Sequence, residues 1–582
     1  MRTIPRRCSL AVTFSSLLLC ALCVPPAALA VWPDDPAINL AVADGPGEQV
    51  MPKIAGLPDG SCYVGWFSNA SGNYDVRLQR LDPNGNEMWP HNGILVSGHP
   101  QDSWITDWDM ICDSQGNCVL AFNDIRSGNW DVQAYMIDPD GVFVWGPDGV
   151  TLSHDPAPDM TPAICETSDG DFVFAWTTDP DVGTGWMTMQ RLGPDGTLRL
   201  PDGGLVVIHV ANETPAFADL VPSDGGDALL MWVRDISAYM SPRHIRLQRF
   251  DAHGSAVWAS FVAIFDGGAV PMGYAPEILS DAAGGAVCGW HYSPSTSIVS
   301  LAQRVTAAGA EVFPHNGVLV STNTTRVHVD PATAYSADTG EIFVFWNERN
   351  STQSQWGIYG QRLSALGTRM WGNEGLVLRT VSAEYKAYPR AVPLGDGAAC
   401  FYTDTPAGFT GDRLVAHRLD AAGANLWSPV PLLVSTAQSG KSRLPLFIDG
   451  LGTTRIAWQD TRNGTPDVYA QNVDAHGRLG VDPTSVDEPR LIARGSSYPN
   501  PFRGSTSIQL ETAAGGAARL VIAGLDGRVV RDVDIILRAG GAAAWRWDGR
   551  DDAGREVPAG VYTYRWQTGS ESHAQGKVVV VR

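Results

Sequence analysis

The sequence predicts an all-β protein: an eight-bladed β-propeller with four-stranded blades, followed by a small immunoglobulin-like β-sandwich. Three observations lead to this class. Gly and Pro are abundant, at 62 and 39 of 582 residues, and only 18% of residues are charged, which is typical of a turn-rich β protein rather than of a coiled coil or a disordered chain. One turn motif recurs eight times within residues 31–480. From residue 498 onward this repeat stops, while short alternating strands continue.

The N-terminus has the features of a secretory signal peptide. Arg2, Arg6 and Arg7 precede an apolar run that ends at Leu22, and the small-residue sequence Ala-Leu-Ala ends at Ala30. The run is too short for a transmembrane helix, which needs about 20 apolar residues. We therefore expect residues 1–30 to be a cleaved leader, and the protein to be secreted or displayed at the cell surface without a membrane span.

A glycine in the same turn marks each copy of the repeat. The eight copies are 54 to 58 residues apart, at Gly85, Gly141, Gly196, Gly254, Gly309, Gly367, Gly423 and Gly477. An alternating strand precedes each turn, and upstream of it lies a strand that ends at an aromatic residue such as Trp66. Another aromatic residue, such as Trp89, and a short apolar strand follow the turn. Four strands per copy in eight copies predict a propeller over residues 31–480.

The two ends of the repeat predict how the ring closes. Copies one to seven are each followed by an outer strand, whereas the eighth runs into the polar stretch Gly480-Val-Asp-Pro-Thr. Residues Ile38 to Val42, which precede the first copy, have the outer-strand pattern. We expect them to complete blade eight, because this pairing leaves no sheet edge unpaired.

After a predicted linker over residues 481–497, residues 498–582 are predicted to form a β-sandwich. The motifs appear in the order Tyr498-Pro-Asn-Pro-Phe, Asp526-Gly-Arg-Val-Val, Trp547-Asp-Gly-Arg-Asp, Asp552-Ala-Gly-Arg-Glu-Val, Gly560-Val-Tyr-Thr-Tyr and Lys577-Val-Val-Val-Val-Arg. This order resembles the FlgD-type immunoglobulin-like domain, and equally the C-terminal sorting domain of proteins exported by the bacterial type IX secretion system. The resemblance implies a surface address or tether, with secretion machinery as a partner, rather than chemistry.

Charge and cysteine content exclude several functions. The chain carries a formal charge of −21, of which the leader contributes +3 and the segment from Ser496 onward +2, so the middle carries about −26. Nucleic acid is therefore not expected as a partner, since phosphate binding needs a basic surface. The six cysteines after the leader show neither a disulfide framework nor metal-ligand spacing. Cys112 and Cys118 flank a tight turn, so one disulfide across that hairpin is geometrically possible.

The loops between the second and third strands share a rim with the loops that enter each blade, and variable loops on a fixed scaffold are where specificity is built. Acidic residues stand two positions after the strand aromatic in four copies, at Asp124, Glu348, Asp404 and Asp460. They form either a carboxylate cluster for acid–base chemistry or turn and packing pairs with arginines such as Arg126 and Arg462. Their recurrence at one repeat position favours the second interpretation.

Tyr74, Trp130 and Trp356 occupy one repeat position just before the third strand. Exposed rings there would stack on sugar rings, and otherwise they cover the blade edges. Acidic turns such as Asp138-Pro-Asp-Gly and Ser223-Asp-Gly-Gly-Asp offer oxygen ligands for a structural calcium ion but lack the full calcium-loop pattern. We interpret them as plain turns, and expect no cofactor.

These features predict an exported surface-binding or adhesion protein whose ligand, a glycan or a protein, meets the rim. The candidate ligand-binding residues are Tyr74, Asp124, Arg126, Trp130, Glu348, Trp356, Asp404, Asp460 and Arg462. The alternative is a polysaccharide-degrading enzyme, a glycoside hydrolase or lyase, on the same scaffold. No catalytic residue is predicted, because the sequence lacks the common nucleophile, zinc and phosphate-loop motifs, and this favours the binding protein.

Overall fold

The computed structural model describes residues 32–101, 108–180, 184–235, 242–294, 297–480, 494–498, 500, 502–512, 516–524, 528–537, 541–568 and 571–581. The predicted leader, residues 1–30, lies outside these ranges, as do residues 481–493 of the predicted linker. Nearly all described elements are strands, and the described helix is the three-residue η1 (Asp224–Gly226). Among the described residues no helix is long and apolar enough to cross a membrane.

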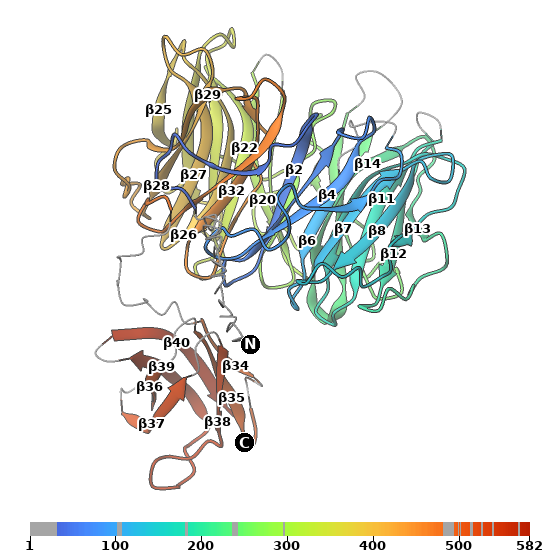
Figure 1. The fold of residues 1–582 in the computed structure, drawn as a ribbon. Helices are drawn as coiled ribbons and strands as arrows, with labels where there is room; N and C mark the ends of the chain where they lie inside the picture. The colour runs from blue at the N-terminus through green and yellow to red at the C-terminus, as the bar shows by residue number, and fades with distance from the viewer. Residues whose placement is uncertain are drawn as a thin grey trace, which may run out of the picture.

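Eight antiparallel sheets confirm the propeller, and Figure 1 shows them as successive blades along the coloured chain. The first four blades, from the innermost strand outward, are β2 (Gln49–Gly56), β3 (Cys62–Ser68), β4 (Asp75–Leu81) and β5 (Ile94–Ser97); β6 (Asp109–Cys112), β7 (Cys118–Asp124), β8 (Asp131–Ile137) and β9 (Val150–Thr151); β10 (Asp159–Glu166), β11 (Phe172–Thr178), β12 (Trp186–Leu192) and β13 (Leu205–Ile208); and β14 (Thr214–Pro222), β15 (Ala228–Asp235), β16 (His244–Phe250) and β17 (Val262–Phe265).

The other four blades follow the same order. They are β18 (Glu277–Ser280), β19 (Ala286–Tyr292), β20 (Val299–Val305) and β21 (Val318–Leu319); β22 (Val327–Ser336), β23 (Glu341–Arg349), β24 (Trp356–Leu363) and β25 (Leu376–Ser382); β26 (Tyr385–Leu394), β27 (Gly397–Thr405), β28 (Asp412–Leu419) and β29 (Leu432–Ser439); and, for blade 8, β30 (Lys441–Ser442) with β31 (Leu446–Ile448), then β32 (Thr454–Asp460), β33 (Asp467–Val473) and β1 (Leu40–Ala43).

The N-terminal segment closes the ring, as predicted. Strand β1 pairs with β33, with Leu40 opposite Ala470, so the closing strand lies within about two residues of the predicted segment Ile38 to Val42. Asn39 reinforces the junction, because its side-chain amide donates to the Gln471 side chain at 3.3 Å. Blade 8 thereby receives its outer strand from the other end of the chain.

The repeated turn glycines leave room for aromatic rings at the junctions between blades. Each has positive φ, and in most blades the aromatic ring that follows the third strand of the preceding blade lies against it. At Gly309, where φ is 80°, an added Cβ would lie 3.0 Å from the Trp258 ring. The Trp258 indole also donates to the Ala307 carbonyl at 3.1 Å. At the closing junction Trp32 takes this role, donating to the Pro83 carbonyl at 3.1 Å beside Gly85.

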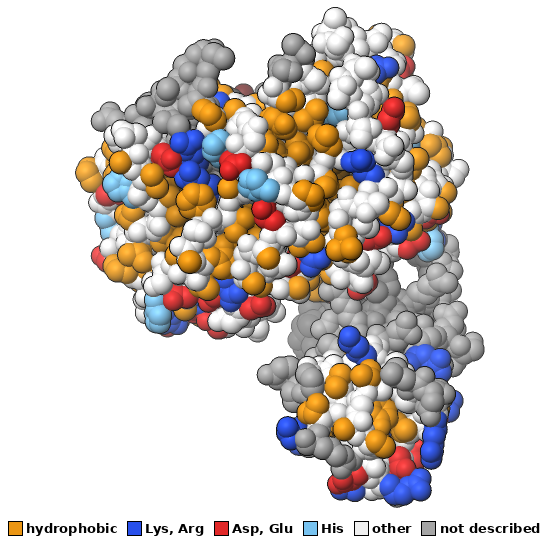
Figure 2. All heavy atoms as spheres, turned by 180° about the vertical axis from the view of Figure 1, so that it is seen from behind, with side chains coloured by type: hydrophobic (Ala, Val, Ile, Leu, Met, Phe, Trp, Pro, Cys, Tyr) orange, Lys and Arg blue, Asp and Glu red, His pale blue; other side chains and the backbone are white. Residues whose placement is uncertain are grey.

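The C-terminal part is a separate sandwich of two sheets. One sheet has the order β34 (Arg494–Tyr498), β35 (Thr506–Thr512), β38 (Gly541–Trp547); the other has the order β37 (Val529–Leu537), β36 (Gly516–Gly524), β39 (Gly560–Thr568), β40 (Glu571–Val580). Trp547 and Trp566 are buried between them in a core of its own. The first strand begins at Arg494, inside the segment predicted as linker. Figure 2 shows Lys and Arg side chains around the margins of this domain.

Two sequence expectations about side chains also meet the structure. Cys112 and Cys118 lie directly opposite each other on β6 and β7, and both thiols are free. The acidic turn at Asp138 is an ordinary turn in which its carboxylate accepts the backbone N–H groups of Asp140 and Val142. Within the described ranges, no group of three or more His, Cys, Asp or Glu is arranged to hold a metal ion.

Candidate ligand-binding site

The innermost strands of the propeller share an irregularity that faces the central cavity. In blades 1, 3, 4, 6 and 7 two consecutive residues drop out of the pairing with the second strand. The first of the two has a left-handed backbone, with φ between 50° and 57°, at Met51, Thr161, Phe217, Asp330 and Tyr388. Arg443, which separates β30 from β31 in blade 8, has φ 51°. We call these six the bulge residues.

The bulges are costly in isolation and are therefore informative. A non-glycine residue at positive φ costs about 1–3 kcal/mol, and such strain gathers where a protein presents groups to a ligand. A bulge also redirects a side chain that a regular strand would bury in the sheet. Proline follows the bulge residue at Pro52, Pro162, Pro331 and Pro389, and its missing N–H leaves no unpaired donor there. The bulges thus direct strand side chains towards the cavity, and the prolines leave no unpaired backbone N–H group at these positions.

A cavity of about 500 Å³ opens among the innermost strands of blades 5, 6, 7, 8 and 1. Four of the six bulge residues line it: Met51, Asp330, Tyr388 and Arg443. Tyr274, Glu277, Lys53 and Arg390 add further polar groups. The volume lies within the range of small-ligand pockets, about 300–1,000 Å³, and the lining is rich in charged and tyrosine side chains.

The charged groups of the cavity are divided between two walls. The acidic wall consists of Glu277 on blade 5 and Asp330 on blade 6. The basic wall consists of Lys53 on blade 1, Arg390 on blade 7 and Arg443 on blade 8. A ligand in the cavity therefore meets negative groups on one side and positive groups on the other.

Asp330 is held in place from two directions. Its backbone N–H donates to Nδ1 of His291 at 3.3 Å, and its Oδ2 lies 3.6 Å from Nη2 of Arg349. Burial lowers the pKa of His291 to about 4, so the imidazole is neutral near pH 7 and accepts the hydrogen bond. The His291 ring also lies against Tyr274, with ring centroids 4.1 Å apart. One bulge and one cavity tyrosine are therefore supported by the same histidine.

The four carboxylates, for which the sequence left open a rim cluster or packing pairs with arginine, lie inside the blades. Asp124, Glu348, Asp404 and Asp460 are each at most 2% exposed. Asp124 accepts hydrogen bonds from Arg126, with Nε to Oδ2 at 2.9 Å. Asp404 accepts from Arg413 at 2.9 Å. The structure brings each of them to a partner in its own blade, and none of them lines the cavity.

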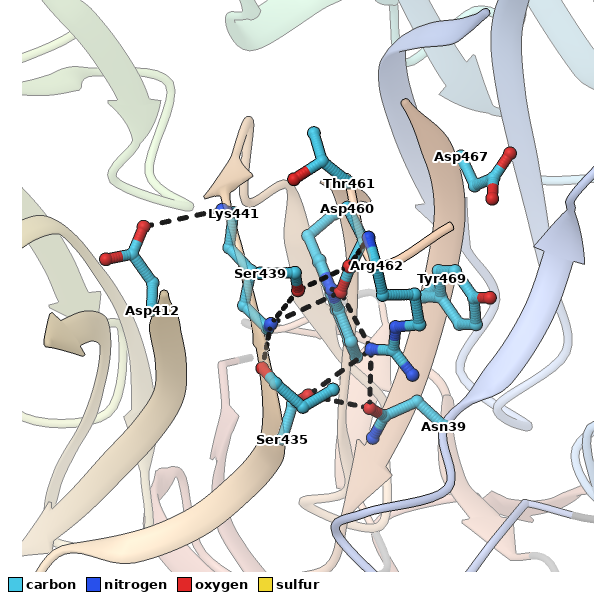
Figure 3. Close-up of polar contacts among 12 residues, drawn as sticks. Asn39, Asp412, Ser435, Ser439, Lys441, Asp460, Thr461, Arg462, Asp467 and Tyr469 are labelled. Atoms are coloured by element: carbon cyan, nitrogen blue, oxygen red, sulfur yellow. Dashed lines mark hydrogen bonds and ion pairs between the residues drawn. The ribbon is translucent and has the colours of Figure 1, made fainter. Parts of the chain in front are cut away.

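Asp460 has the densest set of partners, drawn in Figure 3. It accepts from Arg462 at 2.7 Å, from Ser439 at 2.6 Å and from the indole of Trp458 at 2.7 Å, and Nζ of Lys441 lies 3.3 Å away. Burial by itself would raise the pKa of Asp460, but Arg462 and Lys441 outweigh it and lower the pKa to about 2. Arg462 also stacks on Tyr469, 3.8 Å from the ring centroid. This cluster ties β30, β32 and the closing segment together.

Glu348 differs from the others because its neighbour is a histidine. Its Oε2 accepts from the Trp346 indole at 2.6 Å and lies 3.3 Å from Nε2 of His328. Burial raises the pKa of Glu348 to about 7 and lowers that of His328 to about 4. Both groups are therefore uncharged between these values, and they form a neutral polar pair in the core of blade 6.

The three predicted rim aromatics are half-buried. Tyr74 donates to Oε2 of Glu48 at 2.7 Å, and burial with this contact raises the pKa of Tyr74 to about 12. Trp356 meets Tyr385 edge to face at 5.3 Å between ring centroids. Trp130 precedes β8, and its backbone carbonyl accepts from Asp159. None of the three lines the cavity.

Sequence reasoning missed the bulge residues, although a signal for them exists. A proline stands at an equivalent position in four innermost strands, at Pro52, Pro162, Pro331 and Pro389, and Pro276 directly precedes a fifth, β18. Proline inside a strand marks an edge or a bulge. The innermost strand of a blade has an unpaired edge at the central cavity. A proline that marks either an edge strand or a bulge is therefore consistent with this strand.

Comparison with known proteins matches a family to the C-terminal part of the chain and finds distant likenesses among solved structures. Residues 497–572 match the family FlgD Ig-like domain. No curated protein sequence matches the chain. Among solved structures, the chain is similar to an α-L-arabinanase of Penicillium chrysogenum complexed with arabinobiose, at 14% identity over 55% of this chain and 94% of that one, with a TM-score of 0.33.

Two further solved structures are similar in the same way. The polysaccharide lyase Uly1 is 10% identical over 74% of this chain and 90% of its own, with a TM-score of 0.40. The GH93 α-L-arabinofuranosidase of Fusarium graminearum, in complex with arabinobiose, is 14% identical over 56% and 95%, with a TM-score of 0.31. At these identities and TM-scores the likenesses carry nothing about activity, and the propeller fold rests on the strand pairing of this chain.

Proposed function

We propose that this chain is an exported, surface-associated protein that binds a glycan in the central cavity between blades 5 and 1. The observation that carries the proposal is the set of bulges that turn Asp330, Tyr388 and Arg443 towards that cavity at a cost in backbone strain. Tyrosine rings combined with hydrogen-bonding side chains suit the mixed apolar and hydroxyl surface of a sugar. The binding site thereby moves from the predicted rim loops to the innermost strands.

The rim residues support binding indirectly in this proposal. Asp124, Asp404 and Asp460 are occupied by arginine or lysine partners inside their blades. Their role is to fix the loops around the cavity. The C-terminal sandwich serves as the routing or tethering module, a role supported by its match to the FlgD Ig-like domain family and by its separate core.

The test is a glycan array run with the purified full-length protein, followed by titration of the best binder. Tyr388→Ala is expected to weaken binding by about tenfold or more, as loss of a central aromatic contact does. Tyr385→Ala is the matched control: Tyr385 lies on the same strand and is 36% exposed against 40% for Tyr388, but it does not line the cavity. If Tyr385→Ala weakens binding more than Tyr388→Ala does, the ligand binds at the rim aromatics beside Trp356 and not in the cavity.

A reducing-end assay on the same polysaccharides tests the alternative of an enzyme. Glu277 and Asp330 are the carboxylates of the cavity. Binding without release of new ends is the expected result. If new reducing ends are released, and if Glu277→Gln abolishes this release, the protein is a polysaccharide-degrading enzyme rather than a binding protein.

A further inference from the structure

The basic wall is unusual for this molecule. The chain has a formal charge of −21, yet three of the five charged residues of the cavity are cationic. At physiological ionic strength charges are screened beyond about 8 Å, so the acidic surface far from the cavity has little influence within it. The groups that line the cavity therefore decide which ligand charge is favoured there.

The two arginines of the basic wall are not neutralised by the protein. Neither Arg390 nor Arg443 forms an ion pair with any residue in the part of the chain that the structure describes. Arg390 donates through Nη1 to the carbonyl of Pro389 at 2.9 Å. Asp330, on the opposite wall, has Arg349 of its own blade as its nearby cation instead. Two guanidinium groups thus face the cavity with donors left for a ligand.

Arg443 also occupies a strained position that another residue would fill at lower cost. Its φ is 51°, a region in which Asn and Asp are the favoured non-glycine residues. Arginine supplies a planar fork of N–H donors that matches the two oxygens of an acid group. The strained backbone of Arg443, its lack of an ion pair among the described residues and its donor geometry together favour an anionic group as the ligand at this wall.

Building on the proposed function, we infer that the ligand is an acidic glycan whose carboxylate or sulfate group binds to the basic wall of Lys53, Arg390 and Arg443. Tyr274 and Tyr388 contact the sugar rings, and the acidic wall accepts hydrogen bonds from hydroxyl groups on the other side. The saccharide is oriented by its acid group, because only one wall attracts it.

The experiment compares three polymers by calorimetric titration with the full-length protein: polygalacturonate, the same polymer after reduction of its carboxyl groups, and dextran sulfate. A preference for polygalacturonate over its reduced form identifies a carboxylate as the bound group. A preference for dextran sulfate identifies a sulfate. Equal binding of the reduced polymer, or binding of neutral glycans alone, overturns the inference and leaves the proposed glycan binding standing.

Variants make the test specific to the wall. Arg443→Asn removes the charge, suits the positive φ, and is expected to weaken binding of the acidic polymer about 10- to 100-fold, the range for loss of a charge-assisted contact. Arg443→Lys retains the charge and is expected to retain much of the binding. Arg478→Gln removes one charge from an exposed turn outside the cavity and is expected to leave binding unchanged.

Three other outcomes would also be decisive. If Arg443→Asn and Arg478→Gln weaken binding equally while both melt like the parent protein, general charge attraction replaces the site and the inference is wrong. If polyglutamate binds as tightly as polygalacturonate, the partner is an acidic peptide rather than a glycan. If no glycan of any kind binds, the proposed function falls together with the inference.

Discussion

Asp460 is a charged group from which water is excluded, and its partners determine what replacing it costs. Both Asp460 and Lys441 have fully buried side chains. Removing one member of a buried ion pair leaves the other charge uncompensated, which costs about 3–5 kcal/mol. Asp460→Asn is therefore expected to lower the free energy of unfolding by about that amount, measured by urea denaturation.

The partner variant separates charge from packing at this position. Lys441→Met combined with Asp460→Asn removes both charges of the pair and is expected to recover part of the loss. A double variant that is as unstable as the sum of the two single variants would show that the pair carries no coupling, contrary to the arrangement in Figure 3.

The buried carboxyl of Asp159 predicts that the stability of the protein depends on pH. Its carboxyl is fully buried on β10, and burial raises its pKa to about 7, whereas in the unfolded chain an Asp titrates near 3.9. The folded state therefore holds a proton that the unfolded state releases. This contribution to stability is complete below about pH 4 and is lost as the pH rises through about 7.

Asp159→Asn removes this titration. Relative to the parent protein, the variant is expected to gain stability between pH 4.5 and 7.5, by up to about 4 kcal/mol for a shift of this size. Unfolding free energies from urea melts at three pH values within this range give the measurement. A stability difference that stays constant with pH would mean that the carboxyl is ionised in the fold.

The contacts between turn glycines and aromatic rings recur at the blade junctions. They allow a matched pair of glycine variants to be compared. Gly309→Ala places a methyl group 3.0 Å from Trp258, whereas Gly170→Ala, at nearly the same φ (80° and 83°), meets nothing within 4 Å. Both variants carry the same backbone cost, so their difference isolates the steric clash. Gly309→Ala is expected to be less stable by a further 1–3 kcal/mol or so in thermal or urea melts, as overpacking is.

An equal loss of stability in the two glycine variants would show that the turn needs glycine only for its backbone. In that case the ring of Trp258 would contribute no packing constraint at this junction.

The blades themselves were predictable from the sequence because strand alternation and turn chemistry are local. The spacing of the turn glycines from Gly85 to Gly477 counts the blades correctly. The cavity was not predictable in the same way. Its residues come from five blades, and their convergence depends on ring closure and on bulges that break the period-two alternation on which strand prediction relies. The recurrence of acidic residues at one repeat position did predict the pairs of Asp124 with Arg126 and of Asp460 with Arg462.

At the scale of the whole molecule, the propeller and the sandwich have separate cores. Deleting residues 494–582 is therefore expected to leave the melting temperature of the propeller unchanged, because ring closure uses β1 and not a strand of the tail. Calorimetry of the purified propeller measures this. A collapsed transition would show that the sandwich is structurally part of the ring.

The same deletion tests the routing proposal in the producing cell. Fractionation is expected to find the shortened protein inside the cell envelope, whereas the full chain reaches the surface. Normal surface delivery of the shortened protein would refute a routing role for the C-terminal domain.

Closure by the N-terminal strand also sets the order of events while the protein is being made. The contact between Asn39 and Gln471 spans 432 residues, so β1, the first strand of the propeller to be synthesised, waits for β33 of the last blade. Contacts this distant form late, after the entropy of joining the ends has been overcome. Until then the nascent chain exposes an unpaired edge at β1. A chain that ends before β33 lacks the partner of this edge, so the exposed edge distinguishes an incomplete propeller from a finished one.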